Sequence, residues 1–424
     1  GDLNAELNSI IKTHSIYEGF SEETLSYVKG LTSKLSSKEI KTRKDFREDC
    51  CFTIDPKDAK DFDDAISVKK IKTNLYEIGV HIADVSFYVK PGTAIDQDAV
   101  KKGCSIYLSN KVVPMLPEKL ANELCSLRPL EEKLCFSIVF NITDRAKIIS
   151  TWAGKTIIKS KKRFTYEGAQ NILDANHGKF LDELRVLDSI SRKLRKNRIN
   201  NGSIIINKKE VFVEFKNGIP LKASSKEVLG TNKLIEEFML LANQKICNYY
   251  TRKTGGVYRV HDKPDPEKLK SLLAFLKRLN LTSILDNKHL SQSINNLLGA
   301  TKKSDYNYLI NQLLLRSMAK AEYSTKNIGH FGLGFKNYSH FTSPIRRYPD
   351  ILTHRILESI LENEKTKMID LEKQCRLASK KEREAIKAER DYMKFLLIWL
   401  IRDKQGEICY ATISSVQRWG IYAE

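Results

Sequence analysis

The spacing of hydrophobic and polar positions is typical of helices in the first part of the chain and typical of strands after it. Up to residue 47 the apolar residues recur at helical spacing, as in LNSIIKTHSIY and EETLSYVKGLTSKL, and Ser21 is placed to cap the second segment. From Cys50 short runs of strand character follow, namely CFTI, AISV and YEIGVHIADV. We therefore expect a helical connecting arm over residues 1–47 and a sheet that begins close to Cys50.

The middle of the chain continues this sheet and then becomes helical. Residues 134–158 (LCFSIVFNITDRAKIISTWAGKTII) predict two strands of a hairpin joined around Asp144. Helical periodicity then dominates, with helices expected over 234–250 and 266–281. This order of elements predicts an α/β protein of the mixed α+β kind, in which helices surround a mixed sheet.

The last part of the chain has a glycine-rich stretch at 329–334 (GHFGLG), followed by a helix expected around 344–362. Residues 365–403 contain neither Gly nor Pro and predict one long helix or a helical pair. We interpret their charged run KKEREAIKAERD as a solvated face with many ion pairs. The closing segment GEICYATISSVQRWGIYAE alternates as strands do. Because the chain starts on Gly1 and stops as this segment opens, we expect a fragment of a longer protein.

The net charge predicts a partner of opposite charge. The chain of 424 residues carries 72 Lys and Arg against 52 Asp and Glu, a formal net charge of +20. Such a surplus fits a polyanion, because cations that neutralise phosphates release condensed counterions. Nucleic acid is the favoured partner, with an anionic membrane surface or no partner as the alternatives.

The cysteines and the apolar runs bear on the compartment. None of the eight cysteines forms a C-x-x-C pair, and Cys50 and Cys51 are adjacent, which is an awkward geometry for a disulfide. Thiols in apolar stretches, such as Cys135 in LCFSIVF, are typical of reduced core residues. No signal peptide is visible, and the longest apolar run, 395–401, is too short to span a bilayer. We expect a cytoplasmic protein with no membrane contact.

The segment TIDPKDAKDFDDAI concentrates negative charge in an otherwise basic chain. It holds five carboxylates within ten residues, Asp55, Asp58, Asp61, Asp63 and Asp64. Packed together, carboxylates raise one another's pKa values unless a cation intervenes, and oxygen-only ligands select Mg²⁺ or Mn²⁺. A calcium loop that started at Asp61 is excluded, because its fifth position would be Ala65 and its glycine position Ile66.

An exposed acidic turn, with Asp55 or Asp58 as a helix cap, is the alternative interpretation of the same residues. The setting favours the metal site, because CFTI enters the cluster and AISV leaves it, which places the carboxylates at the edge of a rigid sheet. Two Mg²⁺ ions a few ångströms apart could clamp both the attacking and the leaving oxygen of a phosphodiester.

Several longer motifs resemble those of one enzyme family. TIDPKDAKDFDDAI, HIADVSFYV, VVPMLPEKLANELCSL and HFGLGFKNYSHFTSPIRRYPDILTHR follow one another and closely resemble the catalytic domain of the ribonuclease II/ribonuclease R family. The resemblance extends from about residue 48 to about residue 400. It implies an RNB-type domain that degrades single-stranded RNA processively from the 3′ end and releases nucleoside 5′-monophosphates. We expect Mg²⁺ as cofactor, with Mn²⁺ as an alternative, and a monomer with no obligatory protein partner.

The resemblance also assigns roles to single residues. Four aspartates match the family's metal and catalytic set, Asp55, Asp61, Asp63 and Asp64, which leaves Asp58 as a bystander. Asp63 is expected to be catalytic, because it helps to place the second ion and the leaving group. In SPIRRYPDILTHR, Arg346 matches the residue that stabilises charge developing on the cleaved phosphate, and Arg347 is a supporting RNA contact.

Further RNA-binding positions follow from the same resemblance. Tyr107 matches the aromatic residue that caps the terminal base, and such stacking holds a single strand without sequence preference. The second stacking aromatic of the family falls at Ile205, where this sequence departs from the pattern. We therefore expect a weaker grip on the last nucleotides, or compensation by Phe212. Tyr166 and Glu237 match residues that contact the ribose, whose 2′-hydroxyl distinguishes RNA from DNA.

The expected organisation is an arm (1–47), a catalytic domain (48–362), a long helical segment that completes it (363–403) and the start of an OB-fold RNA-binding module (404–424). No histidine is assigned as a general base, because metal-activated water needs none. Two other functions remain open, an RNA-binding pseudoenzyme and a different two-metal hydrolase such as an endonuclease or a phosphatase.

Overall fold

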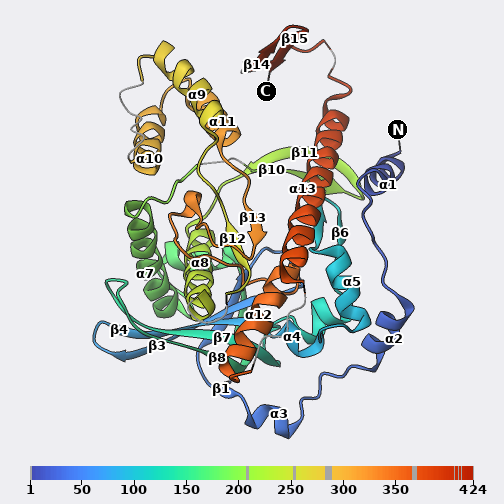
Figure 1. Ribbon diagram of the computed structural model, residues 1–424, viewed down its shortest axis with the longest axis vertical. Coiled ribbons are helices and arrows are strands. Elements are labelled where there is room, and N and C mark those ends of the chain that lie inside the picture. The colour runs from blue at the N-terminus through green and yellow to red at the C-terminus, as the bar shows by residue number, and fades with distance from the viewer. Residues whose placement is uncertain are drawn as a thin grey trace.

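The computed structural model describes residues 2–206, 210–251, 255–281, 289–364, 370–404, 406–408, 410–411 and 413–423. Figure 1 shows helices arranged around a sheet, so the predicted mixed α/β class is confirmed.

The central sheet has seven strands in the spatial order β1-β8-β7-β4-β3-β2-β9. Its strands are β1 (Lys44–Phe46), β2 (Cys51–Asp55), β3 (Asp64–Lys72), β4 (Leu75–Ala83), β7 (Glu132–Thr143), β8 (Ile148–Lys159) and β9 (Lys162–Thr165). The outermost pairs, β1 with β8 and β2 with β9, are parallel, and the other neighbours are antiparallel. Every residue of β2 is buried, as is typical of a strand covered on both faces.

The predicted strands are confirmed in this sheet. CFTI lies in β2, AISV in β3 and YEIGVHIADV mostly in β4, while β7 and β8 form the hairpin expected over 134–158. The hairpin turn follows Asp144 and includes Ala146, whose φ is +61°. The long run of apolar residues in β7 lies in the core, where Phe136, Ile138 and Phe140 are fully buried. The rigid part of the fold is therefore built by residues 44–165.

Helices and short turns cover the sheet. They are α4 (Val85–Tyr88), α5 (Ala94–Lys102), η1 (Lys119–Leu124), α6 (Tyr166–Ala175), α7 (Leu181–Asn200), α8 (Gly230–Thr251) and α12 (Tyr348–Leu361). The short η3 (Phe331–Leu333) instead packs through Phe331 against a separate core. The expected helix around 344–362 begins only at Tyr348, because residues 343–347 form a turn. Pro349 then occupies the first turn of α12, where its missing N–H costs no hydrogen bond.

The long charged segment forms one helix, α13 (Leu371–Ile401), which crosses the front of the molecule in Figure 1. Of the two alternatives predicted for 365–403, one long helix or a helical pair, the structure shows the single helix over these residues, whereas 365–369 lie outside the described residues. One face of α13 packs through Ala388, Tyr392 and Leu396 onto a small second core that it shares with α1 and the β5–β6 hairpin. The opposite face is exposed to solvent.

Smaller units surround this framework. They are the two-stranded sheets β5 (Ile106–Leu108) with β6 (Lys111–Val113), β10 (Glu210–Lys216) with β11 (Ile219–Lys226), β12 (Tyr258–Val260) with β13 (Glu322–Ser324), and β14 (Ile413–Gln417) with β15 (Gly420–Ala423). Three helices, α9 (Pro266–Arg278), α10 (Leu290–Thr301) and α11 (Asn307–Ser317), enclose a core of their own. Among the described residues, no helix is long and apolar enough to cross a membrane.

The N-terminal arm consists of α1 (Leu3–Thr13), α2 (Glu22–Gly30) and α3 (Ser37–Lys41). The hydroxyl of Ser21 accepts the N–H of Thr24 at 3.2 Å, so its predicted role as the cap of α2 is confirmed. The first predicted helix ends earlier than LNSIIKTHSIY suggests, since Ser15 adopts a left-handed conformation with φ +51°.

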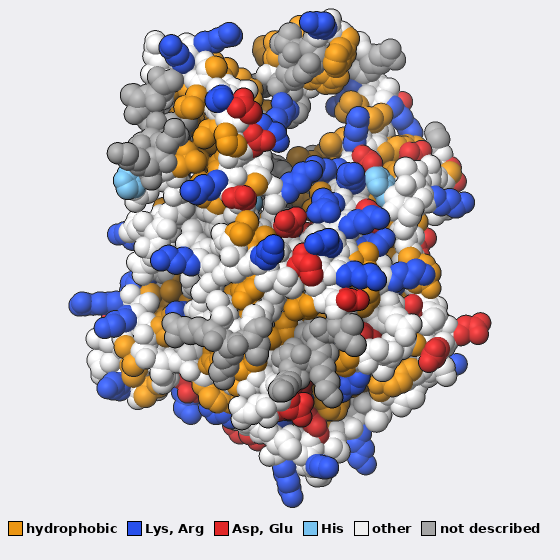
Figure 2. All heavy atoms as spheres, viewed as in Figure 1, with side chains coloured by type: hydrophobic (Ala, Val, Ile, Leu, Met, Phe, Trp, Pro, Cys, Tyr) orange, Lys and Arg blue, Asp and Glu red, His pale blue; other side chains and the backbone are white. Residues whose placement is uncertain are grey.

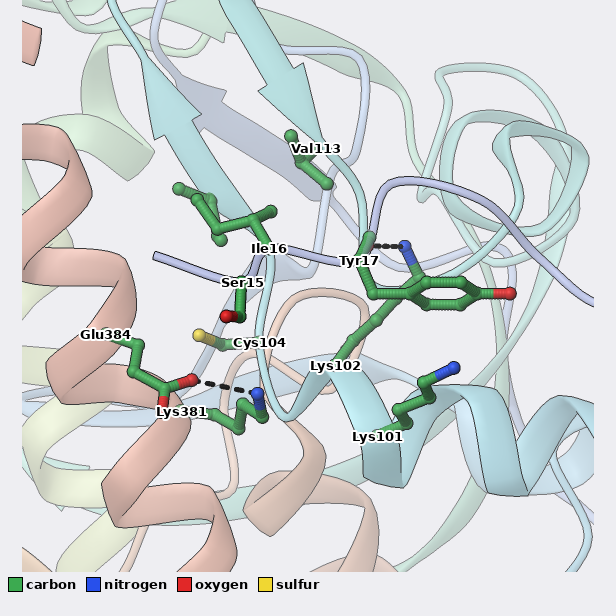
Figure 3. Close-up of a pocket in the computed structure, with 10 residues that line it drawn as sticks. Ser15, Ile16, Tyr17, Lys101, Lys102, Cys104, Val113, Lys381 and Glu384 are labelled. Carbon is green, nitrogen blue, oxygen red and sulfur yellow. Dashed lines mark hydrogen bonds and ion pairs between the residues drawn. The ribbon is translucent and has the colours of Figure 1, made fainter. Parts of the chain in front are cut away.

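Lys102, at the end of α5, fastens this arm to the rest of the fold. Its ammonium group donates to the backbone carbonyls of Tyr17 at 2.8 Å and Glu18 at 3.2 Å. Figure 3 shows the pocket at this junction, where Lys381 and Glu384 of α13 form an ion pair beside the arm. None of the lining residues belongs to the aspartate cluster. This pocket is therefore a structural junction between arm and helix.

Candidate active site

The ends of two strands position Asp55 and Asp64. Asp55 is the last residue of β2 and Asp64 is the first residue of β3, and the antiparallel pairing of Phe52 with Ile66 brings both ends to the same edge of the sheet. The loop between the two strands carries the other aspartates of the cluster. The predicted placement of the carboxylates at the edge of a rigid sheet is confirmed for this pair.

Asp63 connects the cluster to the arginine motif. Its side chain is buried, and its Oδ1 accepts the backbone N–H of Ile345 at 2.8 Å. Its Oδ2 lies 3.6 Å from Nε of Arg346, whose side chain remains 42% exposed. Asp63 and Ile345 are 282 residues apart in the chain, so the fold alone brings the two motifs together. The exposed part of the Arg346 guanidinium is free to meet an anion from solvent.

Asp61 and Tyr107 form a second contact in the cluster. The phenol of Tyr107 donates to Oδ2 of Asp61 at 3.0 Å, and the Tyr107 backbone N–H donates to Oε1 of Glu389 on α13 at 3.1 Å. Burial and the negative charge of Asp61 raise the pKa of the phenol, which keeps it a donor at neutral pH. The aromatic residue predicted to cap the terminal base therefore lies directly against the aspartates.

Burial raises the pKa values of three of these carboxyl groups. The pKa of Asp55 is raised to about 8 by burial and then by the charge of Asp64. Burial raises the pKa of Asp64 to about 6, against the opposing effect of Arg346 and Arg347. The pKa of Asp63 also lies well above its ordinary range, because desolvation outweighs the attraction of Arg346. The cluster holds more negative charge than its own cations stabilise, so an added cation would favour its ionised form.

The donor set fits a magnesium site that is completed by substrate and water. In the part of the chain that the structure describes, no three His, Cys, Asp or Glu side chains lie close enough together to hold a metal ion by themselves. Mg²⁺ does not require such a cage, because it usually keeps several waters and binds one or two carboxylates together with substrate phosphates. Asp55 and Asp64 supply such a pair. Oδ2 of Asp55 is also buried with no hydrogen-bond partner among the described residues.

Arg347 points away from the exposed part of the site. Its guanidinium donates to both carboxylate oxygens of Asp350, at 2.9 and 2.8 Å, and Asp350 is fully buried. Oδ1 of Asp350 also accepts the backbone N–H of Ser343 at 2.7 Å. This pair fixes the turn 343–347, which carries both Arg346 and the amide that Asp63 binds. The predicted RNA contact of Arg347 remains a prediction, and its observed partner is a carboxylate of its own helix.

The two predicted ribose contacts lie in different surroundings. Tyr166 directly follows β9, whose Thr165 pairs with Asp55, and the charges of Asp64 and Asp55 help burial to raise the pKa of its phenol. Tyr166 therefore lies at the cluster. Glu237 on α8 is instead buried, and Arg198 of α7 donates to both of its carboxylate oxygens.

The neighbouring Glu236 is 48% exposed, so of the two glutamates it is Glu237 that turns inward. The ribose contact of Glu237 remains a prediction, and the structure gives its carboxylate arginine partners.

The departure from the family pattern at Ile205 lies in the segment after α7. Ile205 is half-buried, and its backbone N–H donates to the side chain of Asn295 on α10 at 3.2 Å. Phe212, the expected substitute, lies on β10 with its side chain 37% exposed. Asp58 is exposed on the loop between β2 and β3, which agrees with its assignment as a bystander.

Two residues that the sequence did not single out support the site. Arg163 of β9 donates from one nitrogen to the backbone carbonyls of Pro56 at 2.6 Å and Lys57 at 2.8 Å, and so holds the start of the aspartate loop. Asp350 holds the arginine turn. Both stand in recognisable motifs, RFTYEGA and RRYPDILTHR, but nothing in their spacing shows which backbone groups they meet.

Two of the histidines in the motifs, His81 and His354, have structural partners. His81 is fully buried between the hydroxyls of Ser67 and Ser137, and His354 binds the carbonyl of Phe341. Burial lowers the pKa of His81 to about 3 and that of His354 to about 4, so both are neutral. Neither side chain reaches solvent, so neither can act as a general base on RNA.

Residues 43–363 match the family defined by the RNB domain. The chain belongs to this family. The match covers the four aspartates of the cluster and both arginines of the turn. It also covers Tyr107, Tyr166 and Glu237. The resemblance to the ribonuclease II/ribonuclease R family is therefore confirmed.

Relatives extend the match beyond this domain. Ribonuclease R of Thermotoga maritima is 36% identical over 100% of this chain and 62% of its own length. The structure of Mycoplasma genitalium RNase R in complex with ribose methylated single-stranded RNA is 29% identical, with a TM-score of 0.93 over 100% of this chain and 68% of that chain. An Arabidopsis thaliana relative named inactive exonuclease DIS3L2 is 34% identical over 86% of this chain and 37% of its own length. The chain thus spans less than two thirds of the length of the first two curated relatives, 62% and 61%.

Proposed function

We propose that this chain is a metal-dependent 3′→5′ exoribonuclease that hydrolyses single-stranded RNA processively to nucleoside 5′-monophosphates. One observation carries the proposal: Asp63 meets the amide of Ile345 at 2.8 Å and Nε of Arg346 at 3.6 Å. The aspartate cluster and the arginine motif, distant in sequence, thereby form one site that offers carboxylates to cations and an exposed guanidinium to a phosphate.

The carboxylates would hold two divalent cations, with Mg²⁺ favoured over Mn²⁺. Asp55, Asp61 and Asp64 are the proposed ligands, and Asp63 helps to place the second ion and the leaving group. When bound, such ions activate water and stabilise the charge on the attacking and leaving oxygens. The buried, unpartnered Oδ2 of Asp55 and the raised pKa values of Asp55 and Asp64 support this assignment.

Arg346 would stabilise the negative charge that develops on the phosphate during cleavage. A guanidinium presents a fixed fork of donors that matches phosphate oxygens, and a donor that is already oriented needs no reorganisation during the reaction. Asp63 binds only its Nε, and the hydroxyl of Ser343 accepts from Nη2 at 3.1 Å. These contacts orient the side chain and leave its outer edge free.

The RNA end would be held by groups on either side of the aspartates. Tyr107 offers an aromatic face, 40% exposed, on which the terminal base can stack. Tyr166 lies close enough to Asp55 and Asp64 to read a ribose hydroxyl. Only the family resemblance supports an RNA-binding role for Glu237, Arg347 and Ile205. We further propose a cytoplasmic monomer without an obligatory protein partner, in which 404–424 begin an OB-type RNA-binding module.

The test is incubation with 5′-labelled single-stranded RNA and Mg²⁺. We expect a descending ladder of labelled products that EDTA abolishes, with nucleoside 5′-monophosphates released from the other end. Products of fixed internal length, or hydrolysis that survives EDTA, would contradict the proposal.

The pseudoenzyme is the second candidate, because a relative at 34% identity is named an inactive exonuclease. Asp55, Asp61, Asp63, Asp64 and Arg346 are all present and grouped in this chain, which favours cleavage over binding alone. The other open function is an endonuclease built on the same carboxylates. RNA whose 3′ end is blocked distinguishes it from the proposed exonuclease. The block should stop the proposed exonuclease and leave an endonuclease unaffected.

A further inference from the structure

A single cationic row covers the solvent face of α13. Its members are all exposed: Lys373, Arg376, Lys380, Arg383, Lys387, Arg390 and Lys394. Their spacing alternates between three and four residues, so at 100° per residue they occupy an arc of about 100° on the helix surface. Figure 2 shows Lys and Arg side chains gathered over the middle of this helix. We call these seven residues the α13 row.

Few carboxylates neutralise the α13 row. Arg376 lies 3.2 Å from Glu372, and Lys380 lies 3.9 Å from Glu384. For the other five members, the described part of the chain offers no ion-pair partner within 4.0 Å. Glu384 pairs more closely with Lys381 at 2.8 Å, and Asp391, at the edge of the row, pairs with His14 at 2.7 Å. Within KKEREAIKAERD the expected ion pairs are present at Lys380, Lys381, Glu382 and Asp391, whereas Arg383, Lys387 and Arg390 have no such partner among the described residues.

Repulsion between the charges of the α13 row destabilises the helix, and a bound polyanion would relieve this repulsion. Neighbouring members stand at i,i+3 or i,i+4, where like charges are adjacent and destabilise an isolated helix. They follow one another at about 5 Å along the axis, well inside the Debye length of about 8 Å at physiological salt, so their potentials add. Solubility alone would be served equally well by cations distributed among carboxylates.

We propose that the α13 row binds the phosphodiester backbone of the RNA substrate outside the active site, which rests on the proposed function. The row is straight, spans roughly 31 Å of helix, and presents a line of cations suited to a linear polyanion. A membrane-binding helix would carry apolar side chains beside its cations. From 373 to 394 the arc itself holds none, and the one exposed large apolar side chain of this stretch, Ile386, lies about 40° outside the edge of the arc and forms no apolar face.

The α13 row and the candidate active site lie on opposite faces of the same helix. Glu389, which binds the backbone of Tyr107, and Glu382, which pairs with Arg259 at 2.7 Å, project about 150° and about 130° from the middle of the row. The row therefore cannot be part of the site itself. RNA must extend well past the cleaved nucleotide to reach it, so only long RNA should gain affinity from the row.

The test compares two variants of the 424-residue chain with equal net charge. The row variant is Arg383→Gln, Lys387→Gln and Arg390→Gln, in which glutamine preserves helix propensity. The matched control is Lys69→Gln, Lys70→Gln and Lys72→Gln on exposed positions of β3. Binding of oligoadenylates of about 5 and about 30 nucleotides is measured in EDTA between low and moderate salt, since one OB-sized site covers 4–16 nucleotides.

The row variant should bind the long RNA about tenfold more weakly, with a log–log salt slope flatter by about 2, while its affinity for the short RNA is unchanged. The control should match the unaltered chain on both RNAs. Equal behaviour of the two variants, or an equal loss on both RNA lengths, would overturn the proposal. So would a loss of binding to phosphatidylserine vesicles with long RNA unaffected.

Hydrolysis separates this inference from the proposed function. If the unaltered chain cleaved no RNA in Mg²⁺ but the row variant still lost affinity for long RNA, the α13 row would stand and the exoribonuclease proposal would fail. If the unaltered chain cleaved both RNAs and the row variant kept full affinity for the long RNA, the exoribonuclease proposal would stand and the α13 row proposal would fail.

Discussion

At the scale of single residues, the site is a balance between buried carboxylates and a few fixed cations. Asp55, Asp63 and Asp64 are desolvated, and each has a raised pKa. Arg346 opposes this effect at Asp63 and Asp64 but is itself exposed, so it cannot neutralise the whole cluster. Divalent cations and a substrate phosphate would complete the balance.

Arg346→Ala should lower the turnover number about 10²- to 10³-fold and weaken RNA binding far less, because the guanidinium acts on charge that appears only during cleavage. Single-turnover hydrolysis and binding in EDTA measure the two effects separately. An equal loss in both would mean that Arg346 binds the ground state of the RNA instead.

Ile205→Phe should shorten the final RNA products by restoring a second stacking face, since isoleucine can pack on a base but has no π face. The measurement is the length of the end products from a 5′-labelled substrate, with Phe212→Leu as a companion variant. If Phe212 compensates in the unaltered chain, the companion variant should lengthen the products. Unchanged lengths in both variants would show that neither residue grips the RNA end.

At the scale of elements, the turn 343–347 depends on a charge pair that the helix after it provides. Arg347 and Asp350 are both shielded, and the Asp350 carboxylate also accepts the N–H of Ser343. Removing one partner of a buried pair leaves the other charge uncompensated, which is more damaging than losing an exposed pair. The orientation of Arg346 therefore depends on a residue that touches no substrate.

Asp350→Asn should lower the free energy of unfolding by about 3–5 kcal/mol and also lower the turnover number with little change in KM. Urea unfolding and steady-state kinetics at a temperature where the variant is folded measure both. Glu267→Gln is the matched control, because it breaks the exposed pair with Lys270, and it should cost at most about 1 kcal/mol. A variant as active as the unaltered chain would show that Asp350 has no positioning role.

Local sequence patterns predict the helices and strands well, because interactions between residues close in sequence stabilise these elements. The strand runs, the hairpin around Asp144, the cap at Ser21 and the single helix α13 all follow from periodicity or from a side chain bonding a nearby backbone group. The predicted start of α12 and the predicted end of α1 are wrong, because a turn at 343–347 replaces the first residues expected for α12 and a turn at Ser15 replaces the last residues expected for α1.

Partners distant in sequence are not predictable in this way. The inward turn of Glu237 depends on Arg198 of a different helix, and the pairing with Asp350 leaves only 18% of the Arg347 side chain exposed. The aspartate cluster was found from its spacing and its strand setting together with the family resemblance, whereas Arg346 was found from the resemblance. Their contact through Asp63 is a property of the fold alone.

At the scale of the whole molecule, the sheet order places the site where separate parts of the chain converge. β2 lies between β3 and β9, so Asp55 has the start of β3 on one side and Thr165, next to Tyr166, on the other. The parallel pairing of β2 with β9 joins residues more than 100 apart and has no local signature. The site therefore requires the complete sheet.

Buried neutral histidines make the fold sensitive to acid. Burial lowers the pKa of His81 and His330 to about 3 and that of His354 to about 4, whereas unfolded histidines titrate near 6.5. The unfolded chain thus binds more protons between these values, so stability falls as the pH falls below 6.5. At pH 5 the loss should be about 2 kcal/mol for each histidine relative to pH 7.5.

The raised pKa values of Asp55, Asp63 and Asp64 act in the opposite direction, because each of these groups holds its proton in the folded state at a pH where it has lost it in the unfolded state. The measurement therefore uses urea unfolding of the Asp55→Asn, Asp63→Asn, Asp64→Asn variant at pH 7.5 and pH 5. Equal or higher stability at pH 5 would contradict the assignment of neutral, buried histidines.

The most direct test of the proposed active site is Asp63→Asn. Asparagine keeps an oxygen for the amide of Ile345 but removes the charge beside Arg346, so the fold should persist. Hydrolysis of 5′-labelled RNA in Mg²⁺ should fall below detection while RNA binding in EDTA stays within about twofold of the unaltered chain, since Asp63 contributes to chemistry and not to ground-state binding. Asp58→Asn, on an exposed residue of the same loop, should keep full activity. Retained turnover in Asp63→Asn would contradict the assignment of the aspartate cluster as the catalytic centre.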